Sequence, residues 1–205
     1  MLRESERGIG DSDILPGVIK IASLCPNLLL CEVRALTAAG KAQKITGLPL
    51  CVHSATGTRY QQYLIEAAGA NMEKVYFSHM ESPTNRENRT PDMQIDYIAD
   101  TINRGSYVSF NGFGHPAYLA VDDLAALVKG VIDRGCAGKI LLSLDFYWTY
   151  QDGKRRFAYD EVASYVSQRT YPFLMTYVLP WLKEIRVSDG DIACMIHENA
   201  QALFS

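Results

Sequence analysis

Short apolar runs alternate along this chain with longer amphipathic stretches, and this alternation limits the possible folds more than any other feature of the sequence. The short runs are apolar at nearly every position, which is typical of parallel strands covered on both faces. We predict strands at Val18–Ala22, Leu48–Val52, Val75–Ser78, Tyr107–Phe110 and Ile140–Leu144. We predict helices at Leu30–Ile45, Arg59–Ala68, Met93–Asn103, Val121–Arg134, Tyr159–Glu184 and Asp189–Phe204. This repeated strand–helix order predicts an α/β protein.

About five strand–helix units leave two architectures open. An open parallel sheet of five strands is a complete domain, whereas a (β/α)8 barrel of the TIM type needs eight units. The number of units alone therefore favours the open five-stranded sheet. Three helices end in a glycine just before the next strand, where the left-handed conformation that glycine permits closes a helix: Gly47, Gly105 and Gly135. Ser188 is the predicted N-cap of the last helix.

The composition argues against several functional classes. The chain has 20 Lys and Arg against 23 Asp and Glu, a net charge of −3. It has no basic run, so we expect no nucleic-acid partner. No window approaches 18 uninterrupted apolar residues, and the charged N-terminal residues lack the pattern of a secretory signal, so we expect no membrane partner. Five cysteines without a CxxC pair predict reduced thiols in a cytoplasmic protein.

Four predicted strands finish with one ionisable or metal-binding side chain. These are Lys20, His53, His79 and Asp145, at separations of 33, 26 and 66 residues. The first two separations each correspond to one strand–helix unit and the third to two, so the four groups should converge at one end of the sheet. Imidazole and carboxylate groups gathered in this way suit a divalent cation. Taken one by one, each histidine is more often a packed residue, and Asp145 is also a plausible helix cap.

The same segments resemble the phosphotriesterase-like branch of the amidohydrolase superfamily. The resemblance covers essentially the whole chain, and its motifs follow in family order: GVIKIAS, LTAAGKAQKITGLPLCVHSATG, AGANMEKVYFSHM, ILLSLDFYW, VLPWLKEIRVSDGDI and HENAQALFS. It implies a (β/α)8 barrel that holds two divalent ions, usually zinc. Lys20 stands at the position of a lysine that CO2 carbamylates (N6-carboxylysine) and that bridges both ions. His53 and His79 stand at ligands of the second ion, and Asp145 at a ligand of the first that helps to deprotonate the water.

This resemblance implies metal-assisted hydrolysis of an organophosphate, a lactone or a related small-molecule ester. Two cations flanking one water lower its pKa from about 15.7 towards about 7, which makes hydroxide available at neutral pH. The cations also polarise the oxygen of the group under attack. In this scheme Asp145 is the catalytic residue that takes or relays the proton.

The sequence also departs from the family pattern. It contains no His-x-His pair, the motif that begins the family's site on strand one. By motif order the chain corresponds to strands four to eight, so we expect residues 1–205 to form one truncated barrel domain without strands one to three. Open barrel edges would favour association, such as a homo-oligomer that covers them. The alternative function is therefore a catalytically inactive remnant that acts as a binding or interaction module.

Smaller departures lie at Glu81, where the family often has aspartate, at Asn111, which replaces a carboxylate, and at Ala200 in the closing Asn-Pro. Aromatic residues after the last two strands are candidates for a substrate-binding pocket: Phe113, Phe146, Tyr147 and Trp148. Packing of these rings against the barrel is the equally weighted alternative. We expect His115 to be a loop residue and His197 to be a surface or packing residue.

Overall fold

The computed structural model describes residues 1–23, 27–54, 57–115, 118–145, 148–151, 153–157 and 169–205. Its centre is one parallel sheet in which each strand pairs with the next strand along the chain. The strands, in their order across the sheet, are β1 (Ile19–Ser23), β2 (Leu50–Ser54), β3 (Val75–Ser78), β4 (Tyr107–Phe110) and β5 (Ile140–Leu142). This confirms the predicted α/β class with five strand–helix units.

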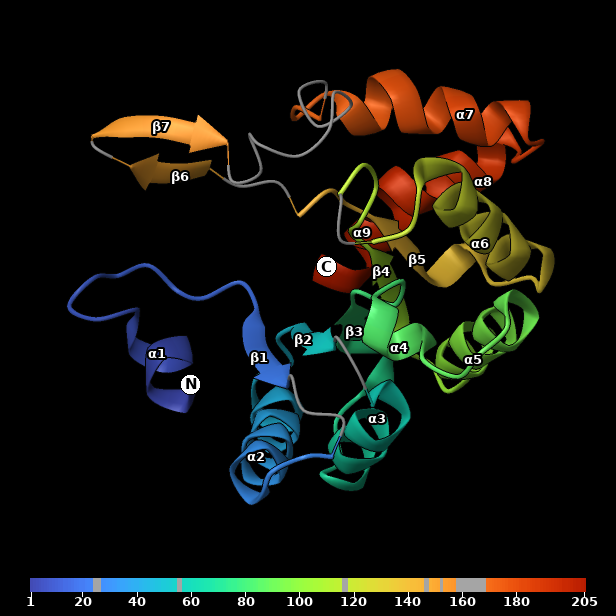
Figure 1. Ribbon diagram of the computed structural model, residues 1–205. Coiled ribbons are helices and arrows are strands. Elements are labelled where there is room, and N and C mark those ends of the chain that lie inside the picture. Colours follow the sequence, from blue (N-terminus) through green and yellow to red (C-terminus); the bar gives the residue numbers. More distant parts are fainter. Residues whose placement is uncertain (24–26, 55–56, 116–117, 146–147, 152, 158–168) are drawn as a thin grey trace.

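A long helix connects each strand to the next. The connections are α2 (Leu30–Thr46), α3 (Thr58–Ala67), α5 (Pro91–Asn103) and α6 (Val121–Asp133), which lie along one face of the curved sheet in Figure 1. The glycines predicted to end three of these helices all have positive φ, at 71° for Gly47, 100° for Gly105 and 78° for Gly135. Thr90 caps the start of α5, since its side chain accepts a hydrogen bond from the Met93 N–H.

Central strands β3 and β4 have the predicted bounds, whereas the other strands are shifted or shortened. β2 begins only at Leu50, because Pro49 has no N–H to donate to a neighbouring strand; its carbonyl instead accepts from the Ile19 N–H at 2.8 Å. β5 ends at Leu142, and Asp145 then turns the chain with a φ of 47°.

Apolar side chains from the strands and helices form one core. Val52, Phe77, Val108, Phe110 and Ile140 are fully buried within it. Edge strand β1 differs, since its Lys20 and Ala22 side chains are exposed. The Lys20 side chain is accessible because, among the described residues, β1 pairs only with β2 and forms an edge of the sheet.

The C-terminal part packs helices against the end of the sheet that carries β5. It consists of the π-helical turn η4 (Leu174–Val178), α7 (Leu179–Glu184), α8 (Asp189–Ala193), the second π-helical turn η5 (Cys194–Glu198) and α9 (Asn199–Phe204). Ser188 is the N-cap of α8, as predicted, and its hydroxyl accepts from the Asp191 N–H at 3.0 Å. Residues 159–168 of the predicted helix Tyr159–Glu184 lie outside the described part of the chain.

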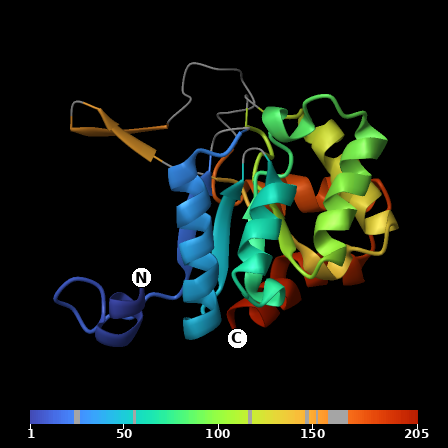
Figure 2. The ribbon, with the colours of Figure 1, turned by 90° about the horizontal axis from the view of Figure 1, so that it is seen from below.

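Several short elements were not predicted from the sequence pattern. They are α1 (Leu2–Arg7), α4 (Pro83–Arg86), the 3-10 turns η1 (Met72–Lys74) and η2 (Ala137–Lys139), and a hairpin of β6 (Trp148–Gln151) and β7 (Lys154–Phe157). The hairpin stands away from the main sheet in Figure 1 and in Figure 2. Within the described residues, no helix has the length and apolar character needed to cross a membrane.

Candidate functional site

Two predicted site residues, His53 and His79, lie next to each other at the ends of adjacent strands. His53 belongs to β2, where it is in register with Ser78 of β3, and His79 follows directly after β3. Their imidazole rings have centroids 4.4 Å apart and are tilted by 55°. The structure therefore brings these two histidines together, in the way the strand spacing predicts.

Tyr118, which the sequence analysis did not single out, contacts His79 from the loop after β4. Its hydroxyl lies 3.1 Å from His79 Nδ1, and the two rings stack with centroids 5.9 Å apart. His115 adds an edge-to-face contact with Tyr118 at 4.7 Å and is itself buried. The hydroxyl contact engages one ring nitrogen of His79, which leaves Nε2 as the ring nitrogen available for another partner.

Both site imidazoles favour the neutral form. Burial, followed by the charges of His53 and Lys20, lowers the pKa of His79 to about 4, although Asp145 acts in the opposite direction. Burial and then the Lys20 charge lower the pKa of His53 below its usual 6.5. A neutral imidazole retains a nitrogen lone pair, which is the form that binds a metal ion or accepts a proton.

Lys20 points toward Cys51 on the neighbouring strand. Its ammonium group donates a hydrogen bond to Cys51 Sγ at 3.0 Å. Tyr76, across from Cys51 on β3, has a pKa raised first by burial and then by its contact with the same thiol. Lys20 also acts electrostatically on both histidines, which places its charge within reach of the site.

Asp145 lies at the other edge of the sheet, three residues after β5. It is exposed and borders an open cleft of about 440 Å³ together with Tyr171 and Met175. Its charge acts on His53, His79 and Glu81. Nevertheless, in the described part of the chain no three His, Cys, Asp or Glu side chains stand close enough together to hold a metal ion.

Glu81 is a buried ionisable group two residues after His79. Its side chain is fully buried, and its Oε1 accepts from the Asn111 N–H at 2.7 Å, while Oε2 has no hydrogen-bond partner among the described residues. Burial raises the pKa of Glu81 to about 7, and the nearby Asp145 charge adds to this effect. Asn111 also faces the site, because its Oδ1 accepts from the His79 N–H at 3.4 Å.

The predicted aromatic pocket residues have different positions. Phe113 is fully buried in the hydrophobic core, which favours the packing alternative for this residue. Trp148 begins strand β6. Phe146 and Tyr147 lie outside the described residues. The substrate-binding role of these four residues remains a prediction.

Five successive strand–helix units that pair in chain order define the class of the protein: it is a partial (β/α) barrel, with its candidate site at the ends of strands β2 and β3. Comparison with known proteins agrees. The model of the phosphotriesterase family matches residues 1–204, and the chain belongs to this family.

Relatives of known name match nearly all of the chain. A phosphotriesterase homology protein of Mycobacterium tuberculosis is 27% identical over 99% of this chain and 59% of its own length. An aryldialkylphosphatase of Saccharolobus solfataricus is 26% identical over 100% of this chain and 62% of its own length. The crystal structure of the Escherichia coli phosphotriesterase homology protein, complexed with phosphate in its active site, superposes with a TM-score of 0.80 at 25% identity, over 100% of this chain and 65% of that one. The chain thus spans about three-fifths of the length of these relatives.

Proposed function

We propose that residues 1–205 form the part of a metal-dependent, phosphotriesterase-type hydrolase domain that corresponds to barrel strands four to eight. The proposed reaction is hydrolysis of an organophosphate, a lactone or a related small-molecule ester. The observation that carries this proposal is the pair of imidazole rings of His53 and His79, 4.4 Å apart on adjacent strands of a family member. The four described cysteines are free thiols, which supports a cytoplasmic location for the protein: Cys31, Cys51, Cys136 and Cys194.

The possible ligand atoms at this site only partly match what a divalent cation such as zinc needs. His53 and His79 supply two nitrogen lone pairs at adjacent strand ends. The described His, Cys, Asp and Glu residues offer no group of three, and we propose that Lys20, carbamylated by CO2, supplies a further ligand. The proposed ligands are therefore Lys20, His53, His79 and Asp145. A cation bound there supplies Lewis acidity, which acidifies water and polarises the ester.

The residues of the chain itself have distinct proposed roles. Tyr118 orients the His79 ring through its hydroxyl contact with Nδ1. The Asp145 carboxylate, exposed at the end of β5, accepts the proton that the water loses. The open cleft beside Asp145 is where we place the substrate, with Tyr171 and Met175 on its wall. Its apolar lining suits the leaving group of an ester.

The second candidate function is a catalytically inactive binding module, and the contact of Lys20 with Cys51 favours it. The Lys20 amine donates to the Cys51 thiol at 3.0 Å, and this contact occupies the nitrogen that carbamylation would need. Exposed apolar side chains near edge strand β1 provide a surface for a partner such as a second copy of this chain: Ile14, Leu15, Leu29, Leu30 and Ile45.

The two functions differ in metal content and turnover. We expect the purified chain, loaded with zinc in bicarbonate buffer, to retain at least one ion per chain by elemental analysis. His53→Ala and His79→Ala should each remove that ion, whereas His197→Ala, an exposed histidine in η5, should retain it. Hydrolysis of an aryl dialkyl phosphate and of an aliphatic lactone is then assayed. Metal-free chains would contradict the proposed hydrolase, and metal without turnover would favour the binding module.

A further inference from the structure

One buried amide connects the two strand ends that carry His53 and His79. Asn85, in α4, is 1% exposed. Its Nδ2 donates to the Ser54 carbonyl at 2.6 Å and to the His79 carbonyl at 3.0 Å. Ser54 directly follows His53 in β2, so the two carbonyls belong to the two chain segments that position the imidazoles. We propose that Asn85 is a positioning residue that fixes the distance between His53 and His79, an inference that rests on the proposed metal-binding function of this pair.

The neighbouring hydroxyls set the orientation of this amide. Thr58 Oγ1 donates to Asn85 Oδ1 at 3.3 Å and lies 2.6 Å from Ser54 Oγ. The oxygen of the amide is therefore directed at a donor, which leaves its NH2 group for the two carbonyls. The Asn85 N–H itself donates to Ser82 Oγ at 3.1 Å, which fixes the backbone of α4 against the segment after β3.

His79 needs such external support because of its backbone. Its φ of 63° lies in the left-handed region, which non-glycine residues rarely adopt without compensating contacts. Two hydrogen bonds converge on the His79 carbonyl, one from Asn85 Nδ2 and one from the Ser82 N–H at 3.0 Å. Loss of the first would allow this turn to relax, and the His79 ring would then move relative to His53.

Two arginines of the same segment, Arg86 and Arg89, donate to its backbone carbonyls. Arg89 donates from Nη1 to the Asn85 carbonyl, and its guanidinium group lies 3.8 Å from the centre of the Tyr97 ring. Arg86 Nε donates to the Glu81 carbonyl at 3.0 Å. These contacts hold the segment from His79 to Arg89 together and connect it to α5 through Tyr97, so a change at Asn85 acts on a fixed segment beside the site.

The chain contains a matched control for Asn85. Asn199 of α9 is also buried, at 4% exposure, and its Nδ2 also donates to two backbone carbonyls, those of Ala137 at 2.8 Å and Ile140 at 2.7 Å. These carbonyls lie at the start of β5, the opposite end of the sheet from the histidines. Substitution of Asn199 therefore removes equivalent hydrogen bonds without touching the site.

The experiment compares Asn85→Ala and Asn85→Asp with Asn199→Ala and Asn199→Asp. Zinc affinity is measured by competition with a chromophoric chelator, and the His53–His79 ring-to-ring NOE is measured by NMR in the metal-free chain. We expect the Asn85 variants to bind zinc about tenfold or more weakly, the size typical of residues that orient metal ligands, and to lose the NOE. The Asn199 variants should keep both, at a comparable loss of thermal stability.

A milder substitution keeps the test decisive if both Asn85 variants unfold. Thr58→Val removes only the hydroxyl that orients the amide, and we expect a smaller loss of zinc affinity in the same direction. Folded Asn85 variants with unchanged zinc affinity and an unchanged NOE would overturn the proposal, as would equal losses in the Asn199 variants. If the unmodified chain binds no zinc, the proposed function fails, and the NOE alone then decides the role of Asn85.

Discussion

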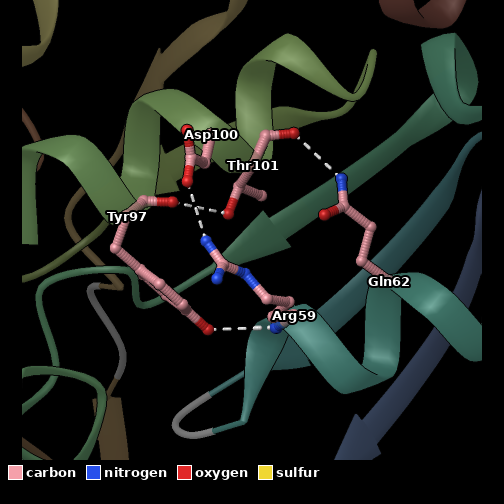
Figure 3. Close-up of polar contacts among 5 residues, drawn as sticks. All are labelled: Arg59, Gln62, Tyr97, Asp100 and Thr101. Atoms are coloured by element: carbon pink, nitrogen blue, oxygen red, sulfur yellow. Dashed lines mark hydrogen bonds and ion pairs between the residues drawn. The ribbon is translucent and has the colours of Figure 1, made fainter.

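Gln62 joins helix α3 to the C-terminal end of helix α5, and its replacement tests how the outer helices stabilise the sheet. Figure 3 shows its side-chain nitrogen directed at the backbone of α5. Gln62 Nε2 donates to the Thr101 carbonyl at 2.9 Å and to Ser106 Oγ at 2.9 Å. The last carbonyls of a helix lack an intrahelical donor, and here the Gly105 N–H bonds to the Ile102 carbonyl, not to Thr101. Gln62 therefore supplies the donor that α5 itself does not.

The burial of these hydrogen-bonded groups determines how much stability Gln62→Leu should lose. Gln62, Thr101 and Ser106 are at most 2% exposed, so Gln62→Leu leaves a buried carbonyl and a buried hydroxyl without their donor. Each unsatisfied buried group costs about 1–3 kcal/mol. Leucine recovers part of this loss by burying an apolar side chain of similar size. We expect Gln62→Leu to lower the free energy of unfolding by about 3 kcal/mol.

An exposed contact between the same two helices provides the comparison. Arg59 Nη2 and Asp100 Oδ2 lie 2.8 Å apart, but the two side chains are 55% and 62% exposed (Figure 3). Ion pairs that are this accessible to water contribute less than about 1 kcal/mol. Asp100→Asn should therefore change the free energy of unfolding by only a few tenths of a kcal/mol, despite the shorter distance.

Urea unfolding followed by far-UV circular dichroism measures both variants at pH 7. Equal slopes of free energy against urea concentration are needed for the comparison, since a changed slope would indicate a different unfolded state. The reasoning is refuted if the free energy of unfolding of Gln62→Leu lies within about 0.5 kcal/mol of that of the unmodified chain, which is about the contribution of one weak hydrogen bond. A larger loss for Asp100→Asn than for Gln62→Leu would refute it as well.

Three further predictions concern helix capping, buried charge and close packing. Lys74 Nζ donates to the carbonyls of Ala202 and Leu203 in the last turn of α9 and to that of Ser205 just after it, so Lys74→Met should cost about 1 kcal/mol in urea unfolding, and high salt should reduce the difference. Folding raises the pKa of Glu81 from 4.5 to about 7. Ionisation of this carboxyl therefore destabilises the folded, metal-free chain increasingly as pH rises from 4.5 to about 7, and the full loss of stability is present above about pH 7. Glu81→Gln should therefore be more stable than the unmodified chain by about 3 kcal/mol at pH 8 and by little at pH 4.5; a pH-independent difference would contradict this. A Cβ on Gly130 would overlap Ile95 Cδ1, so Gly130→Ala should cost about 1–2 kcal/mol, and a double-mutant cycle with Ile95→Val, which removes that atom, should recover part of it.

The sequence pattern predicted the sheet well because each strand is a short apolar run between amphipathic helices. β3 and β4 have the predicted bounds, since buried central strands are apolar from end to end. The bounds of β2 were wrong by two residues because Leu48 packs on the core from a loop, which apolar character alone does not distinguish from a strand. The short helix α1 buries no side chain, so it leaves no periodic pattern to find.

The candidate site was predictable only where strand spacing determines it. His53 and His79 belong to neighbouring strands, and their separation of one strand–helix unit brings their rings together. The contact of Tyr118 comes from the loop after β4 and that of Asn85 from the four-residue helix α4, and the positions of both depend on side-chain packing and hydrogen bonds rather than on periodicity. The Lys20–Cys51 contact needed the register of β1 against β2, in which these two residues are direct partners.

The pairing of every strand with its successor in the chain has a consequence for how the protein folds during synthesis. Paired residues such as Ile19 and Leu50, or Leu50 and Val75, are separated by a single strand–helix unit throughout the sheet. Each strand therefore meets its neighbour soon after it leaves the ribosome, with no need to wait for a distant segment. We expect the sheet to grow one unit at a time from β1 towards β5, with His53 and His79 brought together when β3 joins β2 and before Asp145 is made.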